Sequence, residues 1–261
     1  MIKMAMKTPI IFASWKMNKT IEETKDYLDQ FLDQVRKYAG KAEIFILVPH
    51  TALAMAASLT ENSGVKVGSQ NHFWEDFGPY TGEVSASMVR DCGGRYALIG
   101  HFERRLYFHE SLDDLHRKVR AALRNQVIPV ICIGESIEER QAAQTESVIR
   151  KQIDVIFEGF TPSEVEACYL LYEPYWAVGG EKPADPSEAQ EAHWKIRNEI
   201  RKGFGEVAAQ RVKVLYGGSV RKENVSEFLV HPDIDGVGVG RAGLDPDSFL
   251  RIIEAAASIT I

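Results

Sequence analysis

A carboxylate stands at the end of an apolar run and is followed at once by residues that suit a mobile flap. The run is Cys168–Tyr172, and the segment Glu173–Val178 (EPYWAV) leads from it into Gly179-Gly180. Proline and tryptophan give a stiff pivot, whereas glycines let the backbone close over a ligand. The sequence therefore predicts a general base beneath a lid. The alternative is a strand that ends in a surface glutamate before a turn.

Further polar side chains follow two other apolar runs. Lys16 comes shortly after Ile10–Ala13, and His101 and Glu103 come after Tyr96–Ile99. A lysine that turns back toward a strand end offers a fixed positive charge. A neutral imidazole at the start of a short helix can donate a hydrogen bond to a carbonyl group, and Glu103 could pair with Lys16. Each residue alone is more often structural, but with the carboxylate above they form a candidate acid–base site.

Two glycine-rich turns lie near the C-terminus, each at the end of an apolar run. They are Tyr216–Val220 (YGGSV) and Gly238–Gly243 (GVGRAG). Small residues bring backbone N–H groups close to a ligand, and the start of a following helix favours an anion. One such turn alone is an ordinary glycine turn. In a barrel of alternating strands and helices, two such turns after the last two strands are typical of a phosphate pocket. The sequence therefore predicts a phosphate pocket at these turns.

Strand-like apolar runs alternate with amphipathic patterns along the whole chain. Strands are expected at Ile10–Ala13, Ile44–Val48, Val65–Gly68, Tyr96–Ile99, Val127–Ile133, Cys168–Tyr172, Val212–Tyr216 and Gly236–Val239. The clearest helical patterns are Ile21–Tyr38, Leu112–Asn125, Ile137–Phe157, Ser187–Lys202, Lys222–Leu229 and Asp245–Ala257. This order predicts a single (β/α)8 barrel domain, residues 1–261, with parallel strands and a mobile lid after strand six. An open doubly wound sheet is the alternative, but no G-x-G-x-x-G follows the first strand.

Composition narrows the classes of function. A net charge of -6 argues against a general nucleic-acid binder, which needs excess Lys and Arg. No apolar run is long enough to span a bilayer, and the first nine residues are too short and too polar for a signal peptide. Three cysteines (Cys92, Cys132 and Cys168) cannot pair completely, which suits a reduced, cytoplasmic protein.

Six motifs together carry a resemblance to a known family. In chain order they are Trp15–Asn18, Gly78–Glu83, Gly100-His101 with Glu103–Arg105, Cys132–Glu135, Tyr172–Pro174 with Trp176-Ala177, and Tyr216–Val220. With these motifs, and from Ile10 to about Ile253, the chain resembles triosephosphate isomerase. The resemblance implies the interconversion of dihydroxyacetone phosphate and glyceraldehyde 3-phosphate through an ene-diol(ate), without a metal or an organic cofactor.

The resemblance also implies a role for each matching residue. Glu173 is expected to be the base that moves a proton between adjacent carbons. His101 is expected to polarise the carbonyl as a neutral electrophile, and Lys16 to bind and stabilise substrate charge. The phosphate is expected on the backbone amides of Gly179, Ser219 and Gly240, in turns that also contain Gly218 and Arg241. The residues expected to latch or follow the lid are Tyr216, Ser219, Glu135 and Trp176.

A second subunit is implied as well. In the family, the loop at residues 70–83 projects into a partner subunit, with Thr81 near the partner's active site, so a homodimer is expected. This loop carries aromatic side chains at Phe73, Trp74, Phe77 and Tyr80. So many aromatic side chains in one short loop favour a surface that is buried against a partner subunit. The alternative is that these rings pack under their own loop.

Several positions depart from the family pattern. Ser14 stands in place of an asparagine that contacts the substrate. Arg241 stands in place of a glycine, and an arginine would carry strain there if the backbone φ were positive. Phe102 replaces a serine, and the lid carries unusual residues at Tyr175, Glu181 and Pro183. Ser14 and Arg241 resemble the residues of a subgroup of the family that isomerises four-carbon erythrulose phosphates. Isomerisation of a four-carbon substrate therefore stays open as an alternative function. A barrel that binds a sugar phosphate without catalysis is a third interpretation.

Overall fold

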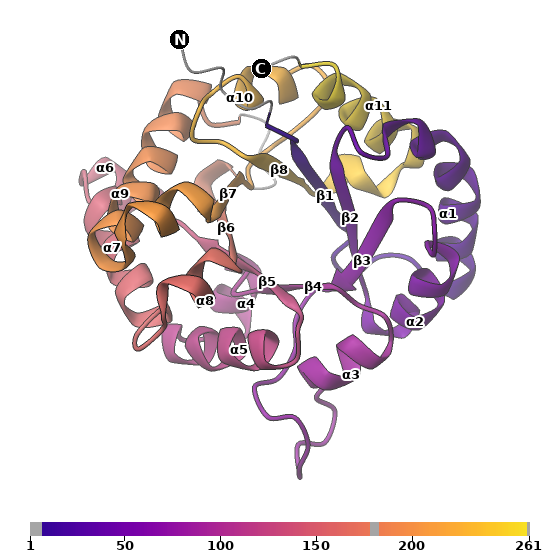
Figure 1. The fold of residues 1–261 in the computed structure, drawn as a ribbon, viewed down its shortest axis with the longest axis horizontal. Helices are drawn as coiled ribbons and strands as arrows, with labels where there is room; N and C mark the ends of the chain where they lie inside the picture. The colour runs from indigo at the N-terminus through magenta and orange to yellow at the C-terminus, as the bar shows by residue number, and fades with distance from the viewer. Residues whose placement is uncertain (1–6, 178–182, 260–261) are drawn as a thin grey trace.

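Parallel strands form a closed barrel in the computed structural model, which describes residues 7–177 and 183–259. Each strand pairs with the next along the chain, and the last pairs with the first (Figure 1). The strands are β1 (Ile10–Ser14), β2 (Glu43–Val48), β3 (Val65–Ser69), β4 (Tyr96–Ile99), β5 (Ile128–Ile133), β6 (Tyr169–Tyr172), β7 (Lys213–Tyr216) and β8 (Gly236–Val239). Among the described residues, the closed ring of eight parallel strands confirms the expected (β/α)8 barrel. The strands could be predicted because strands covered on both faces are continuously apolar.

Helices surround the ring of strands on the outside (Figure 1). The α-helices are α1 (Ile21–Val35), α2 (His50–Leu59), α3 (Ala86–Asp91), α4 (Phe102–Tyr107), α5 (Leu112–Arg124), α6 (Ile137–Gln141), α7 (Thr145–Ile156), α8 (Pro162–Glu166), α9 (Pro186–Arg211), α10 (Val225–Leu229) and α11 (Pro246–Ala257). Short 3₁₀ helices occur at η1 (Arg36–Tyr38), η2 (Tyr175–Ala177) and η3 (Arg241–Leu244). In the described part of the chain, no helix combines the length and the apolar character that crossing a bilayer requires.

Several expected helices have different bounds in the structure. The helix expected at Ile21–Tyr38 is divided into α1 and η1, and the helix expected at Lys222–Leu229 begins as α10 only at Val225. The single helix expected at Ile137–Phe157 is wrong, because α6 ends before Ala143, whose φ of 56° is left-handed and cannot lie inside a right-handed helix. The helix expected at Ser187–Lys202 continues as α9 to Arg211, across a kink at Gly205, where φ is 89°. Apolar periodicity does not reveal one left-handed residue, so neither boundary was visible in the pattern.

The barrel interior is filled with side chains at its N-terminal end. The rings of Phe12 and Phe45 stack with centroids 4.8 Å apart, and Phe45 stacks on Tyr96 at 3.9 Å. The hydroxyls of Tyr96 and Tyr169 both donate to Glu43 Oε1 at 2.8 Å. This end of the barrel is therefore closed by packing, which leaves the C-terminal ends of the strands as the place for a cavity.

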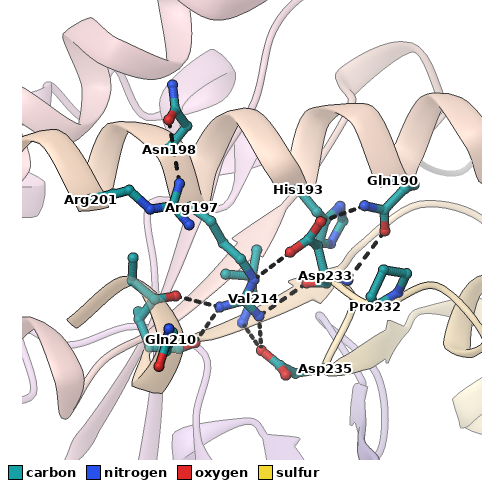
Figure 2. Close-up of polar contacts among 12 residues, drawn as sticks. Gln190, His193, Arg197, Asn198, Arg201, Gln210, Val214, Pro232, Asp233 and Asp235 are labelled. Carbon is teal, nitrogen blue, oxygen red and sulfur yellow. Dashed lines mark hydrogen bonds and ion pairs between the residues drawn. The ribbon is translucent and has the colours of Figure 1, made fainter. Parts of the chain in front are cut away.

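A buried arginine fixes α9 to the barrel. Arg197 donates to the carbonyls of Ala209 and Val212 at 2.7 and 3.2 Å, and it forms ion pairs with Asp233 and Asp235 at 3.2 and 2.6 Å. Figure 2 shows its side chain reaching from the helix toward these partners. Burial alone would raise the pKa of the Asp235 carboxyl, but Arg197, Lys7 and the Val214 backbone N–H together outweigh it and leave that pKa below its usual range. The middle of α9 is therefore fixed to the barrel.

The connection between β3 and α3 extends away from the barrel (Figure 1). The ring of Phe73 packs on those of Trp74 and Tyr80, with centroids 4.0 and 4.6 Å apart, and Arg124 donates to the Trp74 carbonyl. Phe77, by contrast, is 88% exposed. Packing under its own loop therefore accounts for part of the aromatic cluster and leaves Phe77 in contact with solvent.

Candidate active site

A cavity of about 660 Å³ opens where the strands end. Its lining comes from residues within β1, β4, β6 and β8 and from the residues that follow β1, β4, β6, β7 and β8. The residues expected from the sequence that line it are Ser14, Lys16, His101, Glu173, Gly218, Ser219, Gly240 and Arg241. Parallel strands place their C-terminal ends at one rim, which is why residues far apart in the chain meet here.

Lys16 holds its ammonium group at the cavity in an unusual backbone conformation. Its φ is 53°, in the left-handed region that a lysine adopts at an energetic cost. Its Nζ donates to Glu103 Oε1 at 2.6 Å and lies 5.6 Å from the centre of the Phe102 ring. Both charged side chains keep about a third of their surface exposed, at 32% and 33%. The ammonium group is therefore held in place and still open to a ligand.

His101 precedes α4 and is oriented by that helix. The backbone N–H of Glu103 donates to His101 Nδ1 at 3.2 Å, so this ring nitrogen is an acceptor and carries no proton. In a neutral ring the proton is then on Nε2, which lies 2.9 Å from Glu173 Oε1. The imidazole therefore presents an N–H donor to the cavity.

Glu173 is almost fully buried, and both of its carboxylate oxygens are occupied. Oε1 accepts from His101, and Oε2 accepts from the backbone N–H of Phe102 at 2.8 Å. A Cβ on Gly134 would lie 2.1 Å from the Glu173 carbonyl oxygen, so only glycine allows this approach of β5 to the end of β6. The carboxylate has to leave these donors before it can accept a proton from a ligand.

The two glycine-rich turns form the other side of the cavity. A Cβ on Gly218 would lie 2.1 Å from the Tyr216 hydroxyl, so the first turn needs glycine there. The side-chain amide of Asn224 donates to the Ser219 carbonyl at 3.1 Å and holds this turn. Arg241, at the start of η3, is exposed and is not among the residues with positive φ, so the arginine carries no left-handed strain. Gly179, and Glu181 in the lid, lie outside the described residues.

Of the residues expected to latch or follow the lid, Ser219 lines the cavity, whereas Glu135, Trp176 and Tyr216 are not among its lining residues. Tyr172 donates its hydroxyl to Oε1 of the fully buried Glu135 at 2.8 Å, and Arg140 lies over the Trp176 ring at 4.9 Å. Among the described residues, Trp176 Nε1 and Glu135 Oε2 are a buried donor and acceptor without a partner.

Ala184, which follows the segment expected to form the lid, is tied to β7. The Ala184 backbone N–H donates to the Tyr216 hydroxyl at 3.1 Å. Burial raises the pKa of that hydroxyl to about 12, so it stays protonated at neutral pH. Thr81 does not line the cavity of its own chain and is exposed on the projecting loop.

Some residues at the site were not anticipated from the sequence. Cys132 lies next to Glu173, and burial together with that carboxylate raises the pKa of its thiol well above the usual value. Arg105 donates to the Tyr175 hydroxyl. Arg221 also lines the cavity, and its position directly after the YGGSV turn was an available signal. In the described ranges, no group of three or more metal-ligating side chains is placed to hold an ion.

Comparisons with known proteins agree with this geometry. A family model described as triosephosphate isomerase matches residues 9–256. The triosephosphate isomerases of Rubrobacter xylanophilus and Symbiobacterium thermophilum are 42% and 44% identical over 250 and 252 residues, which are 96% and 97% of this chain and 98% of each relative. The crystal structure of triosephosphate isomerase from Bartonella henselae superposes with a TM-score of 0.84 at 32% identity, covering 95% of this chain and 98% of that one. The chain therefore belongs to the triosephosphate isomerase family.

Proposed function

We propose that this protein interconverts dihydroxyacetone phosphate and glyceraldehyde 3-phosphate. The observation that carries the proposal is the meeting of a buried carboxylate, an imidazole N–H and an ammonium group in one cavity, at Glu173, His101 and Lys16. Aldose–ketose isomerisation next to a carbonyl needs one base and one donor for the developing ene-diolate, and no redox carrier. The family membership supports the same reaction and a place in glycolysis.

Each of the three side chains has a distinct part in this proposal. Glu173 takes a proton from one carbon of the substrate and returns it to the neighbouring carbon. His101 donates its Nε2 proton in a hydrogen bond to the oxygen that gains charge, and the ammonium group of Lys16 stabilises the same anion. The Glu173 carboxylate now accepts from His101 and Phe102, so a substrate oxygen that takes over the imidazole N–H also frees the base.

The phosphate group is assigned to the two glycine-rich turns. Gly218 and Ser219 border the cavity on one side, and Gly240 and Arg241 border it on the other. Backbone N–H groups at such turns bind phosphate oxygens, and Arg241 adds a positive charge nearby. Gly179 completes this set in the proposal as the amide that the closed lid contributes.

The wider organisation follows from the same proposal. We assign the chain to one barrel domain, because β8 closes on β1 across the length of the sequence. We also propose a homodimer through the loop at residues 70–83, where Phe77 is 88% exposed and Thr81 lies outside its own cavity. A cytoplasmic location suits the free thiols at Cys92, Cys132 and Cys168.

The four-carbon reaction is the second candidate, and it rests on Ser14 and Arg241, which both line the cavity. Ser14 ends β1, is buried with 8% exposure, and lines the cavity. A serine is shorter than the asparagine that the family has there, so it leaves room for one more hydroxymethylene group. The relatives named above are triosephosphate isomerases, which favours the three-carbon substrate.

The deciding experiment compares substrates side by side. Steady-state kcat/KM is measured with glyceraldehyde 3-phosphate and with each erythrulose phosphate, using wild type and Glu173→Gln. A high value with the triose that is lost in the variant supports the main proposal, whereas a weak triose rate beside a strong tetrulose rate replaces it with the second. A wild type that binds inorganic phosphate and turns over none of these substrates would leave a non-catalytic barrel.

A further inference from the structure

The turn that follows Glu173 is tied to α4 through a tyrosine. Tyr175 is the first residue of η2, and its ring centroid lies 5.8 Å from that of Phe102, at an interplanar angle of 31°. The guanidinium group of Arg105 donates to the Tyr175 hydroxyl, and its central carbon lies 5.6 Å from the same ring. Phe102 and Arg105 both belong to α4, so one helix holds both the ring and the hydroxyl of this tyrosine.

The same helix also holds the carboxylate of the candidate base. The Phe102 backbone N–H donates to Glu173 Oε2, and Phe102 is also the residue whose ring packs against Tyr175. Pro174, between the two contacts, has a fixed φ and limits rotation of the backbone. The end of β6 and the first turn of α4 are therefore joined at two points, at Glu173 and at Tyr175.

These two contacts behave differently during the proposed reaction. The Glu173 carboxylate has to leave Phe102 and His101 in order to reach a substrate carbon. Tyr175 is held by its ring, by its hydroxyl and by its backbone N–H, which donates to the Glu135 carbonyl at 3.2 Å. None of these contacts involves the Glu173 carboxylate, so they can persist while the glutamate side chain rotates. The backbone that carries the base then stays anchored next to the moving carboxylate.

The surroundings of Tyr175 suit a permanent anchor. Burial raises the pKa of its hydroxyl, although the neighbouring Arg105 opposes that change. The hydroxyl therefore stays neutral and can keep accepting from the guanidinium group. Lys16 Nζ also lies 5.6 Å from the centre of the Phe102 ring, so this phenylalanine contacts both the candidate cation and the anchor.

We propose that Tyr175 is a positioning residue for Glu173, anchored by Phe102 and Arg105. It fixes the backbone next to the base, so that the carboxylate swings about a constant pivot into the position required for proton transfer. This inference rests on the proposed isomerase function. A displacement of a catalytic group by about 1 Å can cost about 100-fold in rate, so loosening the pivot is expected to lower kcat and leave KM nearly unchanged.

Two variants separate the contributions of the hydroxyl and the ring. Tyr175→Phe removes only the hydrogen bond from Arg105, and we expect kcat to fall by about threefold to tenfold. Tyr175→Leu also removes the ring packing on Phe102, and we expect kcat to fall by about 100-fold. Tyr169→Phe is the matched control, because it deletes a tyrosine hydroxyl bound to Glu43 at the opposite end of the barrel.

A binding measurement distinguishes positioning from folding and from a wrong function. The probes are 2-phosphoglycolate, which places a carboxylate where the ene-diolate would form, and inorganic phosphate, which does not extend to the base. If Tyr175 positions Glu173, its variants bind 2-phosphoglycolate more weakly than wild type by about the factor lost in kcat, whereas inorganic phosphate binds equally. The control keeps wild-type values for both probes.

The opposite results are equally clear. Tyr175 variants with wild-type kcat and wild-type affinity for 2-phosphoglycolate would overturn the positioning role while leaving the isomerase assignment intact. An equal loss of affinity for both probes would also overturn it, because that pattern indicates a general loss of the folded site. A wild type without turnover would contradict the proposed function, and the binding comparison would still decide whether Tyr175 positions the carboxylate. In the double variant Phe102→Leu/Tyr175→Phe, fold-losses in kcat smaller than the product of the single losses are expected for one shared anchor.

Discussion

The perturbation His193→Phe tests how burial of a histidine sets the acid stability of the barrel. His193 lies in α9 with 0% exposure, its Nδ1 is 2.6 Å from the Ala189 carbonyl oxygen, and its ring meets Tyr172 edge-on at 5.6 Å. Burial lowers the pKa of the imidazole from 6.5 to about 4, although the hydrogen bond to Ala189 opposes it. Phenylalanine keeps a ring of similar size in this place and removes the titrating group.

The sign and size of the change in the free energy of unfolding follow from the pKa of His193 in the folded and in the unfolded protein. Because the pKa is lowered in the folded protein, the unfolded chain binds a proton first as the pH falls below 6.5, and the free energy of unfolding decreases until about pH 4. At 1.36 kcal/mol for each pKa unit, His193 costs the wild type about 3 kcal/mol between pH 7.5 and pH 4. His193→Phe has no titrating group at this position, so its free energy of unfolding does not decrease for this reason. His72, whose pKa burial also lowers to about 4, titrates in both proteins and cancels in the comparison.

Urea unfolding at pH 7.5, 6, 5 and 4 measures this difference by tryptophan fluorescence. The protein concentration is held constant because subunit association would otherwise change the apparent stability. The control is His109→Asn, at an exposed position whose positive φ asparagine tolerates. Parallel pH dependences for wild type and His193→Phe would refute the reasoning, because they would mean that the folded protein protonates His193 as readily as the unfolded chain does.

Three other perturbations have defined outcomes. His101→Ala is expected to lower kcat by about 10²-fold to 10⁴-fold without lowering the melting temperature, and an unchanged rate in the isomerase assay would remove His101 from the mechanism. Ser14→Asn is expected to shift the ratio of kcat/KM values toward the three-carbon substrate by about 10-fold to 200-fold, and equal ratios before and after would show that Ser14 does not set substrate length. Arg197→Met leaves Asp235 buried without its main partner and is expected to destabilise the fold by about 3 kcal/mol, the lower end for a broken buried pair, because Asp235 keeps a 2.6 Å ion pair with Lys7. Urea unfolding that shows a loss below about 1 kcal/mol would contradict that estimate.

The sequence contained most of the information about where the site lies. Lys16, His101 and Glu173 each come just after a continuously apolar strand, and parallel strands in a closed barrel bring such positions to one rim. The strand bounds agree to within a residue, because a strand buried on both faces has a sharp apolar limit. The architecture and the candidate chemistry therefore followed from local patterns.

Other features depend on three-dimensional contacts that no local pattern contains. The helix α2 (His50–Leu59) was not expected, because its alanine-rich sequence has almost no polar face to mark a helical period. The contact of Tyr175 with Arg105 joins segments far apart in the chain, as does the burial of Arg197 against Asp235. Side chains of this kind read as ordinary surface residues until the fold places their partners.

The pairing of β1 with β8 has a consequence for how the chain folds during synthesis. Ile10 to Ala13 obtain the hydrogen-bond partners of their second edge only from Gly236 to Val239, near the other end of the sequence. At about 5–20 residues per second, a ribosome needs roughly 10–50 s to supply them. Throughout that interval an apolar strand has one open edge, which is a template for pairing with another nascent chain. Aggregation during translation therefore depends on the delay between the synthesis of β1 and that of β8. Faster elongation shortens this delay, and a chaperone bound to the nascent chain covers the open edge during it.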